Sequence, residues 1–99
     1  MNKIFFLLLF FNLIGDSINI NTEEMVYVPD KKTAIKIAEA IWLPLYGKSI
    51  YTSKPFIAKL EKGNIWKVEG TLPENTLGGV PEIRFRKSDC KIISVSHGK

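Results

Sequence analysis

The residues that could form a nucleophilic or metal-binding site are few. The chain of 99 residues has one cysteine, Cys90, and one histidine, His97. A Cys–His pair can activate a thiolate for attack, but the extended chain between these two residues spans roughly 23 Å. One histidine and one cysteine are also too few ligands for a zinc site. The sequence therefore predicts no catalytic residue, no metal site and no cofactor.

Carboxylates could form an acid–base pair if they faced an apolar interior. Glu69 and Glu82 fall on the outward faces of the strands expected below. Asp89 falls in a turn, and Glu39 lies on the polar side of the expected helix. No carboxylate is placed for such chemistry, so we do not expect an enzyme.

Two further stretches could contact a partner. The Gly78-Gly79 pair lacks the helix and the Lys-Ser/Thr pair of a phosphate-binding loop, so it indicates a loop with unusual backbone angles. A basic outward stripe follows, formed by Arg84, Arg86, Lys87 and Lys91. Such a stripe is usually a solvated strand face, but arginine is also favoured in interfaces. The residues that we expect to contact a partner are Glu74, Asn75, Gly78, Gly79, Arg84 and Arg86.

A helix is the first element that must position these residues. Asp30 is a good N-cap, because its carboxylate can accept hydrogen bonds from first-turn amides. Pro44 should kink or end the helix, and Gly47 should terminate it with a left-handed conformation. The helix is predicted from about residue 31 to residues 43–46. Its apolar stripe is expected to contain Ala34, Ile37, Ala38, Ile41 and Leu45, flanked by Ile35 and Trp42.

Lys31 and Lys32 fall in the first turn of this helix. The helix dipole disfavours cations there by a few tenths of a kcal/mol. We interpret both lysines as exposed and screened by solvent; the alternative is that they face a partner.

Four strands are expected after the helix. Trp66, Val68 and Gly70 fall on one face of an extended stretch, and a large indole there needs a covering layer. The strands are predicted at 56–60, 65–71, 80–87 and 92–97, with a connector at 48–55, turns at 61–64 and 88–91, and a loop at 72–79. The predicted fold class is therefore α+β, with one main N-terminal helix packed on a four-stranded antiparallel meander sheet.

The first residues have the composition of a targeting segment. A positive charge near the start is followed by an apolar run at 4–14 and by small residues, which is the pattern of a secretory signal peptide. The run is shorter than the roughly 20 residues of a transmembrane helix. We predict a signal peptide at 1–17, a flexible leader at 18–27 and a single domain at 28–99. The protein would be periplasmic or secreted, without stable membrane insertion after cleavage, or membrane-anchored if uncleaved.

The formal net charge is +4. This mild surplus permits an acidic partner or an anionic surface, and no nucleic-acid partner is predicted. The lone Cys90 excludes an internal disulfide, so packing must provide the stability of the domain.

The order of several motifs resembles a known family. The motifs are the helix sequence at 34–47, Lys54-Pro55-Phe56, the segment Trp-Lys-Val-Glu-Gly-Thr-Leu-Pro at 66–73, Gly78-Gly79, and residues 89–99. Together they resemble bacterial immunity proteins with a nuclear-transport-factor-2-like fold. The resemblance covers roughly 28–99, and the short chain implies a reduced version of that fold or a cystatin-like layout. The family tends to have glycine where Cys90 stands; cysteine costs more at positive φ, so a different turn type is an expectation there.

The resemblance implies a protein that binds and neutralises a cognate protein toxin, without substrate or cofactor. Inhibitors of nucleases are expected to be acidic by charge complementarity, so a basic, exported immunity protein fits a toxin that acts on the cell wall or membrane. The alternative is a small periplasmic ligand-binding domain or a cystatin- or propeptide-like inhibitor. A deep apolar pocket beneath the helix would favour the alternative, whereas a filled core would favour the immunity protein.

Overall fold

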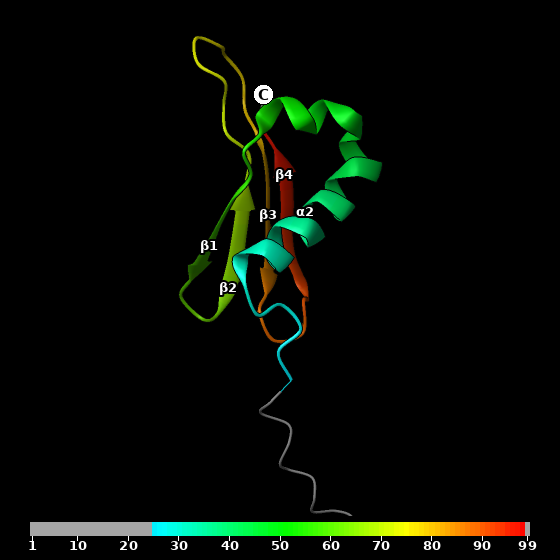
Figure 1. The fold of residues 1–99 in the computed structure, drawn as a ribbon, viewed down its shortest axis with the longest axis vertical. Helices are drawn as coiled ribbons and strands as arrows, with labels where there is room; N and C mark the ends of the chain where they lie inside the picture. Colours follow the sequence, from blue (N-terminus) through cyan, green and yellow to red (C-terminus); the bar gives the residue numbers. More distant parts are fainter. Residues whose placement is uncertain (1–24, 99) are drawn as a thin grey trace, which may run out of the picture.

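The computed structural model describes residues 25–98 as one helical layer on one sheet (Figure 1). The elements are helix α2 (Lys31–Tyr46), the 3₁₀ helix η4 (Gly47–Ser53), and strands β1 (Ile57–Glu61), β2 (Ile65–Glu69), β3 (Pro81–Arg86) and β4 (Ile92–His97). The strands are antiparallel in the order β1-β2-β3-β4. This confirms the predicted α+β class, with a helix followed by a meander.

The predicted signal peptide and most of the predicted leader lie outside the described residues. Tyr27 and Val28 are described, and their amides donate hydrogen bonds to the carbonyl oxygens of Ser88 and Lys87. Within residues 25–98, no helix is long and apolar enough to cross a membrane.

Helix α2 begins where the capping rule predicts. The Asp30 carboxylate accepts a hydrogen bond from the Thr33 amide at 2.8 Å, which satisfies one of the unpaired first-turn donors. Pro44 does not end the helix, which continues to Tyr46. Gly47 then has a φ of 78° and donates its amide to the Leu43 carbonyl, so the positive φ expected at the C-cap is present.

The buried face of α2 is narrower than the predicted stripe. Ala34, Ala38 and Trp42 are fully buried, and their spacing of four places them on one side of the helix. Leu45 is 58% exposed, so its assignment to the stripe was wrong. The last turn of α2 extends sideways beyond the sheet (Figure 1).

The connector predicted at 48–55 is largely helical. The 3₁₀ helix η4 occupies Gly47–Ser53 and buries Ile50 and Ser53. These two residues are three apart, and side chains at that spacing lie on the same side of a 3₁₀ helix. The Tyr51 hydroxyl donates a hydrogen bond to Glu39 and so ties η4 to α2.

The inner face of the sheet supplies the rest of the core. Val68, Ile83 and Phe85 are fully buried, and Trp66 is 4% exposed. Each such side chain contributes about 1.5–3 kcal/mol by leaving water. On the helical side, Trp42 packs edge-on against Phe56, with ring centroids 5.1 Å apart. Leu60 shares the face of Ala58, opposite Trp66 in the register, but is 44% exposed because β1 is an edge strand.

The two hairpin turns lie at the same end of the sheet. Gly63 and Asn64 have φ values of 77° and 57°, as the turn composition predicts. In the β3–β4 turn, Cys90 has a φ of 65°. The turn therefore keeps the positive φ that glycine favours, although a cysteine occupies the position.

Candidate partner-binding surface

The loop that joins β2 to β3 is fixed at its base. The Gly70 amide donates to the Pro81 carbonyl at 2.9 Å, and the Thr71 amide donates to the Ser53 carbonyl at 2.7 Å. The Thr71 hydroxyl donates to the Pro55 carbonyl at 2.7 Å. A Cβ atom on Gly70 would lie 2.7 Å from the Ser53 Cβ. Only glycine permits this close approach, so the loop base is held against the end of η4.

Beyond this base the loop is exposed. Asn75 and Gly78 have positive φ values of 59° and 120°, which turn the chain, and the Thr76 hydroxyl donates to the Pro73 carbonyl at 2.6 Å. Leu77 at the tip is 99% exposed. A large apolar side chain that is fully in water on an ordered loop is a favourable anchor for a partner.

A hollow of about 390 Å³ lies between this loop, η4 and the end of β4. Its lining combines hydroxyl, aliphatic and imidazole groups, from Ser49, Thr52, Ser53, Leu72, Pro73, Thr76, Leu77, Gly79 and His97. The His97 ring packs edge-on against Tyr46 with centroids 4.9 Å apart. A hollow of this size and mixed chemistry can accept a side chain or a short segment of another molecule.

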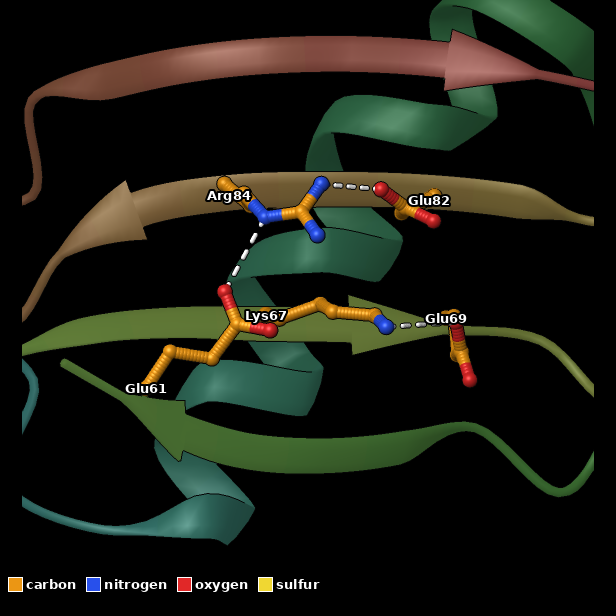
Figure 2. Close-up of polar contacts among 5 residues, drawn as sticks. All are labelled: Glu61, Lys67, Glu69, Glu82 and Arg84. Atoms are coloured by element: carbon orange, nitrogen blue, oxygen red, sulfur yellow. Dashed lines mark hydrogen bonds and ion pairs between the residues drawn. The ribbon is translucent and has the colours of Figure 1, made fainter.

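Arg84 lies on the opposite, outer face of the sheet, within a charged group (Figure 2). Its Nε donates to Glu61 Oε1 at 3.1 Å, reaching across β2, and its Nη1 pairs with Glu82. On β2, between β1 and β3, Lys67 Nζ lies 3.3 Å from Glu69 Oε1. The hydrogen bond that Arg84 donates to Glu61 is the main cause that raises the pKa of Arg84. The positive charge of Arg84 is therefore compensated within the sheet.

Arg86 is compensated in a similar way. Its guanidinium forms two hydrogen bonds with Asp89, one of them at 2.9 Å from Nε. The Lys91 amide donates to the same carboxylate at 3.0 Å. These contacts, first the one from Arg86, hold the pKa of Asp89 well below its usual range. The basic stripe predicted from the sequence is thus partly neutralised.

The structure brings together only part of the predicted site. Glu74, Asn75, Gly78 and Gly79 share the loop 72–79. Arg84 lies midway along β3 and Arg86 lies at its far end, roughly 17 Å from Pro81 at strand rise. Ser49, Thr52 and His97 join the loop in lining the hollow. Sequence reasoning missed them, because they come from separate elements and carry no local motif.

The described residues offer no reactive pair. Cys90 lies in the β3–β4 turn and His97 at the other end of β4. Burial, and then the nearby Asp89 charge, raise the pKa of the Cys90 thiol, which disfavours the nucleophilic thiolate. Within residues 25–98 no three His, Cys, Asp or Glu side chains gather to hold a metal ion. The exposed loop and its hollow are suited to binding.

Comparison with known proteins identifies the family of this chain. No curated protein and no solved structure matches the sequence. The family model described as NTF2 fold immunity protein matches residues 33–99. That match covers most of α2, η4, all four strands and the loop that carries the hollow. The chain therefore belongs to the family of NTF2 fold immunity proteins.

Proposed function

We propose that this protein binds a cognate bacterial toxin and neutralises it by covering part of its surface, without catalysis. Members of its family are generally non-catalytic. The contact region, here called the loop surface, consists of the loop 72–79 together with the hollow beside it. The observation that carries this assignment is the complete exposure of Leu77 next to a hollow of about 390 Å³.

The loop surface has the anatomy of a binding patch. Leu77 and Leu72 supply apolar area, with exposed fractions of 99% and 43%, and the exposed side chains of Glu74 and Asn75 form a polar rim. The hydrogen bonds at Gly70 and Thr71 hold the loop base in place before binding. Less conformational entropy is then lost when a partner docks. We keep Arg84 as an extension of this surface over the outer face of the sheet, and Arg86 as the more distant candidate.

The sequence supports a location for this encounter. The apolar run at 4–14 supports export to the periplasm or beyond. The net charge of +4 favours a toxin that acts on the cell wall or membrane over a nuclease with a basic groove.

A second candidate function is a small ligand-binding or cystatin-like inhibitor domain. The hollow is large enough for a small molecule. However, it lies beside the loop and not beneath α2, where Ala38, Trp42 and Val68 are fully buried. The filled core favours the immunity protein, so this candidate ranks second.

The proposal is tested by co-expressing the full chain with toxin candidates encoded next to it. We expect rescue of growth and direct capture of one toxin. Leu77→Ser should weaken toxin binding about tenfold or more, or about 1.4 kcal/mol, whereas Leu60→Ser, at an exposed leucine on β1, should leave binding unchanged. Equal effects of the two variants would exclude the loop surface as the contact region.

The compartment is tested separately by directing each toxin to the periplasm or to the cytoplasm. We expect protection from a toxin directed to the periplasm. Protection only from a cytoplasmic nuclease would contradict both the exported location and the inferred toxin class.

A further inference from the structure

Three segments distant in the sequence meet at the end of the sheet opposite the loop surface (Figure 1). The Lys87 amide donates to the Asn64 carbonyl at 2.9 Å, which joins the β3–β4 turn to the β1–β2 turn. The Val28 amide donates to the Lys87 carbonyl at 3.1 Å, which adds the segment that precedes α2. Helix α2 starts at Lys31, three residues after Val28. These contacts fix one continuous surface.

This surface concentrates positive charge. We call it the basic end and define it by Lys31, Lys32, Lys62, Arg86, Lys87 and Lys91. Lys31, Lys32, Lys62 and Lys91 are exposed.

The acidic side chains of the same segments are engaged in the fold. Asp30 caps α2 through the Thr33 amide, and Asp89 is bound by Arg86 and the Lys91 amide. Glu61, level with Arg86 across β2, is the third acidic group at this end and is paired with Arg84. Six cationic and three acidic groups leave three positive charges, so the described part of this end carries a positive surplus.

Apolar side chains lie beside these charges. Met25, Val26 and Tyr27 are 54%, 43% and 57% exposed. The Tyr27 amide is bonded to the Ser88 carbonyl at 2.9 Å, and the next residue, Val28, is fully buried. The described chain thus enters the domain through the basic end. In the sequence, the apolar run at 4–14 lies a short distance upstream of this point.

We propose that the basic end docks on the anionic phospholipid surface of a membrane, with the loop surface directed away from the bilayer. Lysine and arginine side chains near an anionic bilayer each add attraction, and tyrosine favours the boundary between headgroups and acyl chains. The exposed apolar residues favour lipid over nucleic acid, since a phosphate backbone offers them no apolar phase. Lys31 and Lys32, unfavourably placed for the helix dipole, gain a role in this arrangement.

The test measures binding of the full chain to vesicles of two compositions. One contains phosphatidylcholine alone, and the other contains equal amounts of phosphatidylcholine and phosphatidylglycerol. We expect binding to the anionic vesicles to be about tenfold tighter or more. The preference should disappear in about 1 M salt, where the Debye length is about 3 Å. Any contribution of the apolar run at 4–14 is common to both vesicles and cancels in this ratio.

Two matched variants locate the surface. K31E/K62E/K91E changes the basic end, and K48E/K54E/K59E makes the same change of charge at exposed lysines elsewhere. In K31E/K62E/K91E, the ratio of affinity for anionic vesicles to affinity for neutral vesicles should fall about tenfold or more. In K48E/K54E/K59E, this ratio should stay within about twofold of that of the unaltered protein. Thermal unfolding checks that both variants fold, and the salt titration of the unaltered protein provides the answer if one does not.

Three results would overturn the proposal: equal losses in the two variants, no preference for anionic vesicles, or tighter binding to double-stranded DNA than to the vesicles. Toxin binding by K31E/K62E/K91E should stay unchanged, because the loop surface is not altered.

Discussion

At the loop end of the sheet, the chain leaves the core after Gly70 and returns only at Pro81, and the residues between them are mostly exposed. At the basic end, main-chain hydrogen bonds join two turns to the N-terminal segment that leads into α2. The indole of Trp66 adds a further bond, donating to the Val28 carbonyl at 2.8 Å. The loop end can therefore change its side chains with little cost to the fold, whereas the basic end is coupled to the core.

The largest expected effect is the loss of the Trp66 indole. Trp66→Ala should lower the free energy of unfolding by about 3–5 kcal/mol, since a buried aromatic side chain leaves a cavity. It also leaves the Val28 carbonyl at the basic end without its donor. Urea unfolding followed by circular dichroism measures the change.

Trp66→Phe keeps one aromatic ring but removes the indole donor and part of the buried ring volume. Its cost should therefore be smaller than that of Trp66→Ala, about 1–3 kcal/mol. A loss below about 1 kcal/mol for Trp66→Ala would mean that the basic end does not depend on the core.

The next effect concerns the base of the loop. Gly70→Ala would place a methyl group 2.7 Å from the Ser53 Cβ and 3.1 Å from the Pro81 Cδ. Such overpacking should cost about 1–3 kcal/mol and displace the loop surface, so toxin binding should fall with stability. The double variant Gly70→Ala with Ser53→Gly removes the Ser53 Cβ, which is the closest atom. It should recover part of the lost stability and part of the lost toxin binding. Full stability in the single variant would show that the loop base is not closely held.

The smallest effect tests the ion pair in the β3–β4 turn. The pKa of Asp89 is lowered in the folded state, so its stabilising contribution is complete above the unfolded carboxyl pKa of about 3.9. It is lost as the pH falls through the folded-state pKa. Asp89→Asn should therefore lower Tm slightly at neutral pH, and the gap to the unaltered protein should close in strong acid. A gap that stays constant down to about pH 2 would assign the effect to the turn geometry instead.

Much of the fold follows from short-range patterns in the sequence. Asp30 and Gly47 mark the ends of α2, Gly63 and Asn64 mark a hairpin, and the alternation around Trp66 and Phe85 orients the strands. These signals depend on local geometry, so they can be read from the sequence without knowledge of the tertiary contacts. The assignment of Leu45 to the buried stripe was wrong for the opposite reason, since periodicity does not reveal where the partner layer ends.

The candidate site was only partly predictable. The exposed loop follows from its composition, but the hollow needs η4, the loop and β4 to converge. The pairing of Arg84 with Glu61 spans β2 and depends on the register of three strands. Neither feature has a signature within a single stretch of sequence. The basic end is a similar case, because its lysines come from α2 and two turns.

The indole bond from Trp66 to Val28 has a mechanical consequence. Traction along the N-terminal segment would first load the bonds of Tyr27 and Val28 to the β3–β4 turn and the bond from β2. The force would pass into the two central strands of the sheet before it reached α2. A domain held by its N-terminal segment could thus resist a pull on its bound toxin while its helix stayed under little tension.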